Sequence, residues 1–158
     1  MSRRNRADKR RMLPDVKFGS VKVAELINVV LQKGKYSIAE RIVYNAIDHL
    51  KQKIGGEDSA LDVFNTSLDH VKPNVEVKSR RIGGANYQVP IEVPDRRSTA
   101  LALRWIVDFS KKRNEKDMAK KLGSELVQAY NNEGSSIRKK VEVHKMAEAN
   151  KAFAHFKY

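Results

Sequence analysis

Basic side chains are the residues of this sequence whose type and spacing suggest chemistry, and they fall in blocks. One block lies within residues 1–17, a second at 78–81 and a third at 96–104, and the fourth comprises Lys111, Lys112, Arg113, Lys116, Lys120 and Lys121. Lysine and arginine neutralise phosphates and release counterions, so several blocks on one face give tight, salt-sensitive binding. The blocks therefore predict a polyanionic partner.

The total charge supports this interpretation. The chain of 158 residues has 32 Lys and Arg against 19 Asp and Glu, a formal net charge of +13. Solubility is usually served by a net charge of about 2–8, and a larger excess costs stability through self-repulsion. Nucleic acid is the first candidate partner and an anionic membrane surface the second.

No arrangement typical of an enzyme or metal site is present in the sequence. The chain has no cysteine, and His49, His70, His144 and His155 lack the spacing of metal ligands. The Gly-Gly pairs at 55–56 and 83–84 fit a helix end and a hairpin turn better than a phosphate-binding loop. Acidic residues have basic neighbours, as in Glu115/Lys116 and Glu142/Lys145. The sequence predicts no catalysis, no cofactor and no metal.

The elements that must position the basic blocks are mainly helical. Apolar residues recur at spacings of three and four, which is the pattern of a helix with one buried face. We expect six helices. The first runs from a Ser20 cap to Gly34, the second from a Ser37/Glu40 capping box to Gly55, and the third from about Asp58 to before Pro73. The fourth follows Pro94, with Ser98 and Thr99 as caps of a helix turn, the fifth starts near Asn114, and the sixth starts near Ser136 and has a thin apolar stripe that reaches Phe153.

A β-hairpin is predicted at about 74–93, where apolar and polar residues alternate. Its turn is expected at 81–86, and Pro90 belongs on an edge because it cannot donate to a strand ladder. Tyr87 is expected to pack inward with Val89, although stacking on a nucleobase is the alternative. An isolated two-stranded ribbon is marginally stable, so its outer end should be mobile until something holds it.

The predicted fold is mainly α: a six-helix single domain at 18–158 with one protruding β-hairpin. Residues 1–17 form a basic N-terminal arm, which should be extended when free. A β-arm on a basic helical body also occurs in architectural DNA-binding proteins, but those insert an apolar wedge such as proline at the tip. The tip here has Gly83-Gly84 instead, which favours RNA. An RNA-modifying enzyme would need a nucleophile or cofactor site.

Two long runs resemble the family of small-subunit ribosomal protein seven. They are Arg80–Val93 (RRIGGANYQVPIEV) and His144–His155 (HKMAEANKAFAH), and the pieces Ile42-Val43-Tyr44 and Leu103-Arg104-Trp105 match as well. The resemblance runs from the basic arm to the last residues. It implies six helices with a long hairpin, which agrees with the pattern of the residues.

The resemblance also implies a function in the small ribosomal subunit. The family binds the 3′ major domain of 16S-type ribosomal RNA early, nucleates head assembly, and lies near exit-site tRNA and mRNA at the subunit interface. The residues implied to contact ribosomal RNA are Arg3, Arg4, Arg6, Lys9, Arg10, Arg11, Lys35, Lys72, Lys78, Arg96 and Arg97. Those implied to approach tRNA or mRNA are Arg80, Arg81, Gly83, Gly84, Lys145 and Lys151.

The expected partners are therefore ribosomal RNA, exit-site tRNA, mRNA and neighbouring proteins of the subunit head and platform. No membrane partner is expected, because no apolar run approaches the ~18 residues of a transmembrane helix and the chain lacks a secretory signal. The protein is also not expected to form a homo-oligomer when it is assembled in the ribosome. The expected location is the ribosome of the cytoplasm, with an organellar ribosome as the less favoured alternative.

Overall fold

The computed structural model describes residues 12–55 and 57–157. Over that part of the chain it has six α-helices, one β-hairpin and a terminal 3-10 helix, which confirms the predicted mainly α fold. The elements are α1 (Val21–Val30), α2 (Tyr36–Ile54), α3 (Ala60–Val71), β1 (Val75–Ile82), β2 (Ala85–Glu92), α4 (Asp95–Lys111), α5 (Met118–Tyr130), α6 (Gly134–Ala149) and η1 (Lys151–Lys157). Within the described residues no helix is long and apolar enough to cross a membrane.

The hydrophobic core lies where α2 and α5 pack against each other and against α1, α3 and α4. Phe64, Leu50 and Leu122 are completely buried there. Gly123 lets α5 approach α2 closely, because a Cβ at this position would lie 2.7 Å from His49 Nδ1 and 3.1 Å from the Ala46 carbonyl oxygen. The apolar stripes that predicted these helices therefore form one common core.

The helix ends differ from several predicted caps. The α3 cap is Ser59, whose hydroxyl accepts from the Asp62 N–H. The Ser37/Glu40 capping box was wrong, because α2 already begins at Tyr36 and Lys35 is its N-cap residue. Ser20 flanks α1 without a side-chain cap hydrogen bond.

Ser98 was predicted to cap a helix turn but lies inside α4. Its hydroxyl is buried and donates to the Pro73 carbonyl oxygen at 2.7 Å. This contact joins the first turns of α4 to the segment that enters the hairpin. Ser98 therefore positions the base of the hairpin.

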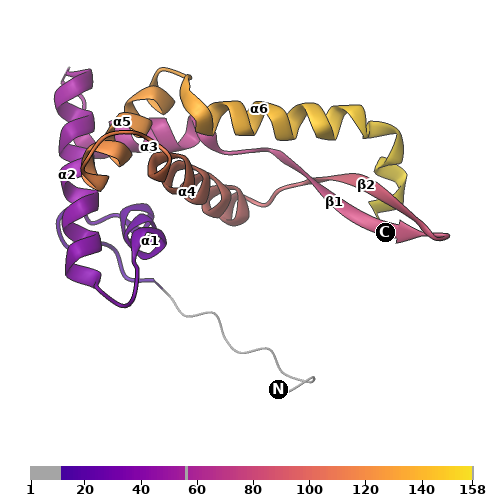
Figure 1. Cartoon of the computed structure of the whole chain (residues 1–158), viewed down its shortest axis with the longest axis horizontal. Coiled ribbons are helices and arrows are strands. Elements are labelled where there is room, and N and C mark those ends of the chain that lie inside the picture. Colours follow the sequence, from indigo (N-terminus) through magenta and orange to yellow (C-terminus); the bar gives the residue numbers. More distant parts are fainter. Residues whose placement is uncertain (1–11, 56, 158) are drawn as a thin grey trace.

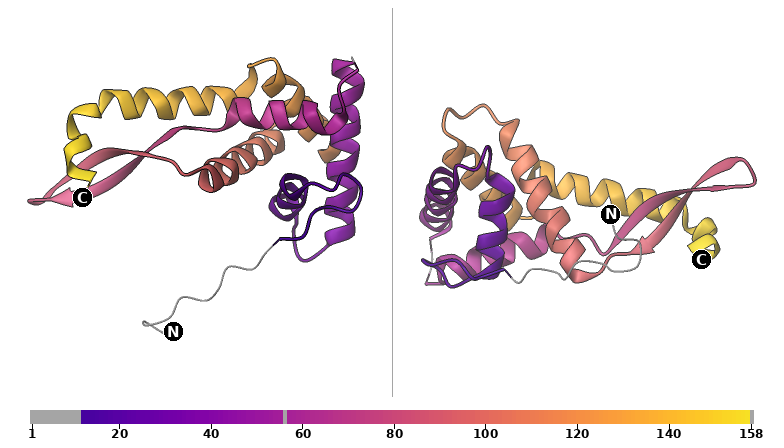
Figure 2. Two further views of the ribbon diagram at one scale, coloured as in Figure 1. Left: turned by 180° about the vertical axis from the view of Figure 1, so that it is seen from behind. Right: turned by 90° about the horizontal axis from the view of Figure 1, so that it is seen from below.

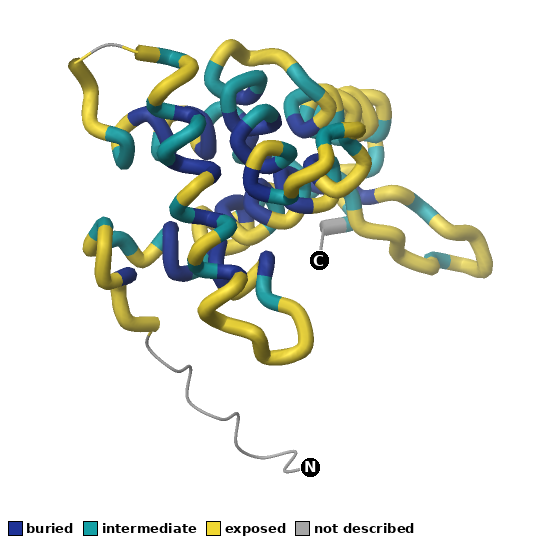
Figure 3. Tube along the Cα trace, turned by 60° about the vertical axis from the view of Figure 1, so that its left-hand side comes forward, coloured by how far each residue is buried: buried dark blue, intermediate teal, exposed yellow. Residues whose placement is uncertain are grey.

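The hairpin and α6 project together from one end of the helical body, as Figures 1 and 2 show. After α6 the chain turns, and η1 comes back onto β2. Burial falls along the hairpin: Glu76 and Val89 near its base are buried, whereas its tip is exposed (Figure 3). The molecule is thus a packed helical body with a long two-part extension.

Candidate nucleic-acid interface

The hairpin tip is a two-residue turn made by Gly83 and Gly84. Their φ angles are +55° and +90°, a conformation that glycine adopts without steric cost. The ladder continues to the pair Ile82 and Ala85, so the turn is shorter than the predicted 81–86. The two strands therefore remain paired up to the two turn residues at the end of the hairpin.

The two arginines next to the tip lie on opposite faces of the ribbon. Arg80 pairs across the strands with Tyr87, and Arg81 pairs with Asn86. Arg80 Nη1 donates to the Phe156 carbonyl oxygen at 3.4 Å, whereas Arg81 is exposed and has no ion-pair partner among the described residues. Arg81 is therefore the cation at the tip that no described residue engages in an ion pair.

Tyr87 belongs to a small aromatic cluster outside the main core. Its ring centroid lies 5.2 Å from that of Phe153 and 5.3 Å from that of Phe156. Tyr87 is half-buried and lies on the same strand face as Val89, as two residues two apart must. The tyrosine thus packs inward as predicted, but against the C-terminal segment and not against the helical core.

The base of the hairpin is held by an arginine that the family resemblance implied as a contact of ribosomal RNA. Arg97 Nε donates to both oxygens of Glu76, at 2.8 and 2.9 Å, and Nη2 donates to Oε2 at 2.8 Å. The carboxylate raises the pKa of Arg97. Its neighbour Arg96 is exposed and makes no ion pair with any described acidic residue. The two adjacent arginines therefore have different roles in the free protein.

Lys72 is likewise engaged inside the protein. Its Nζ lies 3.0 Å from Asp69 and 3.2 Å from Asp95. Burial lowers the pKa of Lys72, but the hydrogen bonds to the two carboxylates outweigh this effect and leave the pKa raised. Lys78 lies 3.9 Å from Glu76 and is exposed.

The last helix ends before the position that the sequence predicted. α6 stops at Ala149, so Phe153 is on η1 and not on a continued helical stripe. Lys145 and Lys151 are exposed on this C-terminal part. Glu142 pairs with Lys139 at 2.9 Å and not with Lys145 as expected, which leaves Lys145 available to a ligand.

Two side chains near the middle of α6 bind it to the rest of the protein. Lys140 donates to the His70 carbonyl oxygen at 2.7 Å, and His144 Nε2 accepts from the Asn74 N–H at 3.2 Å. Burial lowers the pKa of Lys140. Burial and the nearby Lys140 charge lower the pKa of His144, so its imidazole stays neutral at pH 7 and can accept this hydrogen bond.

The basic residues after α4 also differ in whether they are bound to other side chains of the protein. Arg113 donates to Glu125 and to Gln128 at 2.9 Å each, and Glu125, 1% exposed, also accepts from the Ser136 N–H and hydroxyl. Arg113 also pairs with Glu115, which was expected to pair with Lys116. Arg113 is therefore a structural residue that joins α4, α5 and α6, while its lysine neighbours remain on the surface.

Lys35 lies in the connection between α1 and α2, exposed and without an ion-pair partner in the described chain. Lys33, two residues earlier, has a left-handed backbone (φ +51°) beside Gly34. Lys33 was not among the expected RNA contacts. The Lys-Gly-Lys run between two helical patterns is the signal that would have indicated it.

The arm residues Arg3, Arg4, Arg6, Lys9, Arg10 and Arg11 lie outside the described residues. Within the described part of the predicted arm, residues 12–17, the chain is anchored on the body at Asp15, whereas an extended state was expected there. Asp15 is buried, and its carboxylate accepts from the Phe18 N–H at 2.9 Å and from the Tyr44 hydroxyl at 2.7 Å. Burial and the carboxylates of Asp15 and Glu40 raise the pKa of Tyr44. Asp15 is therefore fixed beside α2.

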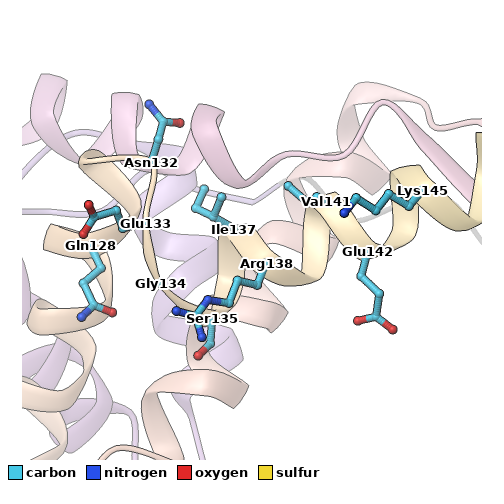
Figure 4. A pocket seen from close by; sticks show the side chains of 10 residues that line it. All are labelled: Gln128, Asn132, Glu133, Gly134, Ser135, Ile137, Arg138, Val141, Glu142 and Lys145. Atoms are coloured by element: carbon cyan, nitrogen blue, oxygen red, sulfur yellow. The ribbon is translucent and has the colours of Figure 1, made fainter.

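A hollow of about 1000 Å³ lies beside the α5–α6 connection (Figure 4). Arg138 and Lys145 line it together with Glu133 and Glu142. These charges balance, so this hollow is not a phosphate groove. Among the described residues no group of three or more histidine or acidic side chains could hold a metal ion.

The family model described as ribosomal protein S7p/S5e matches residues 2–151. The chain is 54% identical to the small ribosomal subunit protein uS7 of Polynucleobacter necessarius subsp. necessarius, over 158 residues that are 100% of both chains. It is 53% identical to the protein of that name in Dechloromonas aromatica and 52% identical to the one in Anaeromyxobacter sp. (strain Fw109-5), again over 100% of both chains.

Proposed function

This chain belongs to the ribosomal protein S7p/S5e family, and from that premise we propose that it binds the 3′ major domain of small-subunit ribosomal RNA, nucleates assembly of the subunit head and lines the path of exit-site tRNA and mRNA. As a member of the family it is a structural constituent of the small subunit of a bacterial-type ribosome in the cytoplasm. It binds ribosomal RNA, works among other ribosomal proteins, and is not an enzyme.

The observation that carries the finer proposal is the shape of the extension. The hairpin and the C-terminal segment lie side by side and project from the body, with Arg81 at the tip and Lys145 and Lys151 along the partner segment. A projecting basic ribbon can follow a groove or a single strand at a distance from the body. It suits the approach to tRNA and mRNA, while the body binds ribosomal RNA.

The residues proposed to contact ribosomal RNA differ in whether they have an ion-pair partner within the protein. Lys35 and Arg96 are exposed and unpaired within the described residues, so they bind phosphate without losing an internal partner. Lys72 and Arg97 keep their carboxylate partners and contribute their remaining N–H donors. The arm adds six further cations. Head and platform proteins, exit-site tRNA and mRNA complete the proposed partners, and the protein is present as one copy without self-association.

The test is binding of the full chain to a fragment of the 3′ major domain of small-subunit ribosomal RNA across a salt series. Scrambled RNA of equal length and duplex DNA serve as competitors. We expect binding that survives both competitors, with the logarithm of affinity falling linearly with the logarithm of salt concentration. If scrambled RNA and duplex DNA competed as strongly as the unlabelled fragment itself, the protein would be a general polyanion binder and the proposal would be refuted.

A further inference from the structure

A second hollow lies on the body, away from the hairpin, where the end of α1, the first turns of α2, the end of α4 and the start of α5 meet. Its volume is about 360 Å³. The side chains that line it are Val30, Gln32, Lys35, Ile38, Ala39, Ile42, Lys111 and Met118. The hollow falls within the range of about 300–1000 Å³ that is typical of ligand pockets.

The walls of this pocket are apolar and its rim is cationic. Val30 and Ala39 are buried at its floor, Ile42 and Met118 are half-buried, and Ile38 is 44% exposed. The polar lining residues are Gln32, Lys35 and Lys111, all exposed. No acidic residue lines the pocket, so its ligand must combine an apolar body with negative charge.

Both rim lysines are available to such a ligand. Lys35 has no ion-pair partner in the described chain, and Lys111 only approaches Asp108, at 3.9 Å. An exposed pair at that distance is worth little. The Gln32 side chain makes no hydrogen bond with any described residue, so its amide can donate and accept toward a polar edge.

We propose that this pocket receives one unstacked nucleobase of the ribosomal RNA, with Lys35 and Lys111 on the adjoining phosphates. The proposal rests on the proposed function and names a ligand group within it. A base has two apolar faces and a polar edge, and its phosphates carry the charge that the rim complements. Specific RNA recognition commonly uses splayed bases of loops and bulges in this way. An acidic protein segment is the competing occupant.

Substitutions that fill the pocket separate base insertion from simple charge attraction. Ile42→Trp on α2 and Met118→Trp on α5 place an indole in the hollow from two different walls. Each should lower affinity for the 3′-domain fragment roughly tenfold, which is the order expected for one lost stacked base, without changing the salt slope. Lys35→Ala and Lys111→Ala should each reduce the slope by about one.

The matched control is Val141→Trp, which adds the same side chain to an exposed position on α6 outside the pocket. It should bind as the unchanged protein does. Melting followed by circular dichroism shows whether Ile42→Trp or Met118→Trp, the two variants that fill the pocket, has lost its fold. If one of them has, the other is used for the binding measurement. If folded filled variants bind as tightly as Val141→Trp, the proposal is overturned. If the unchanged protein shows no specific binding, the proposed function fails instead.

The absence of cysteine allows a direct test of what occupies the pocket. In Gln32→Cys the single thiol can carry an iron chelate that cleaves RNA nearby, and Glu57→Cys, beyond the opposite end of α2, is the control. We expect the chelate at position 32, but not the chelate at position 57, to cleave the fragment around one unpaired nucleotide. In a second experiment, the unchanged protein should protect that base from dimethyl sulfate, and Ile42→Trp should abolish the protection. Absence of cleavage in a formed complex would overturn the proposal and favour an acidic protein segment.

Discussion

Neighbouring basic residues of this chain differ in what they do before any RNA arrives. Arg96 is exposed and unpaired among the described residues, whereas Arg97 satisfies the nearly buried carboxylate of Glu76. The same distinction separates the surface lysines of the fourth block from Arg113, which is held by Glu125. A basic block in the sequence is therefore an upper bound on the cations that a phosphate can reach.

The pair Arg96 and Arg97 allows this distinction to be measured. Arg96→Ala should reduce the salt slope of binding to the 3′-domain fragment by about one and leave the melting temperature unchanged. Arg97→Ala should lower the free energy of unfolding by about 1–3 kcal/mol, because the Glu76 carboxylate is left without its main donor. Urea unfolding and filter binding across a salt series test both, and equal stability of the two variants would contradict the assignment.

His144 should make stability sensitive to mild acid. Its folded pKa is lowered by burial and by Lys140, whereas the unfolded value is near its usual ~6.5. Below about pH 6.5 the unfolded chain binds more protons, so the free energy of unfolding decreases as the pH falls toward the folded pKa and is unaffected above that window. Protonation also removes the acceptor for the Asn74 N–H.

The comparison that isolates this histidine is His144→Gln, whose amide oxygen can still accept a hydrogen bond but does not titrate. Urea unfolding of both proteins at pH 7.5 and pH 5.5 gives the loss of stability on acidification. We expect a larger loss for the unchanged protein. Equal losses would mean that the other histidines and carboxylates account for the acid sensitivity.

Among the elements, the hairpin depends most on a distant segment of the chain. Only two strands form the sheet, and such a ribbon is marginally stable without further packing. The terminal η1 supplies that packing through Phe153 and Phe156 on Tyr87. The predicted mobile outer end is thus held within the protein on one face.

Removal of this aromatic contact should loosen the hairpin. Each aromatic pair contributes about 0.5–1.5 kcal/mol, so Phe153→Ala should accelerate tryptic cleavage after Arg80 and Arg81 roughly tenfold if cleavage follows local opening. Mass spectrometry of the first fragments gives the rate at these two bonds. Val141→Ala, which also truncates an apolar residue in the C-terminal part, should be cleaved at the same rate as the unchanged protein. If Phe153→Ala were cleaved no faster than Val141→Ala, η1 would not hold the hairpin.

As a whole, the molecule separates a rigid helical body from a basic extension, and we expect the two parts to act on different RNAs. The hairpin can be shortened by two residues in each strand, by deleting Arg81, Ile82, Ala85 and Asn86. Gly83-Gly84 then lies between the paired residues Arg80 and Tyr87, so the strand register and the aromatic contact of Tyr87 are kept. Affinity for the 3′-domain fragment should fall by no more than the roughly tenfold effect of one lost phosphate contact. Retention of exit-site tRNA in reconstituted ribosomes should be impaired.

Arg81→Ala is the control that removes the tip charge without shortening the ribbon. If the deletion reduced tRNA retention and Arg81→Ala did not, reach and not charge would be the property that matters. If the deletion abolished binding to the ribosomal RNA fragment, the proposed division between body and extension would be wrong.

Local sequence patterns were sufficient for the helices, the hairpin and the basic surface, because periodicity, glycine and proline act over a few neighbouring residues. The end of α3 before Pro73 and the start of α4 after Pro94 illustrate this, as does the Gly83-Gly84 turn. The runs Arg80–Val93 and His144–His155 also indicated the family, since long stretches of mixed chemistry are specific where single basic blocks are not.

Tertiary contacts alone decided which polar residues are free and which are structural. The partners of Arg97, Arg113 and His144 lie 21, 12 and 70 residues away in the chain, beyond the reach of any local pattern. α2 begins one residue before the capping box predicted at Ser37, and α6 ends at Ala149, after which η1 packs on β2. Packing between distant segments outweighs local preference wherever it buries more apolar surface or satisfies a buried polar group.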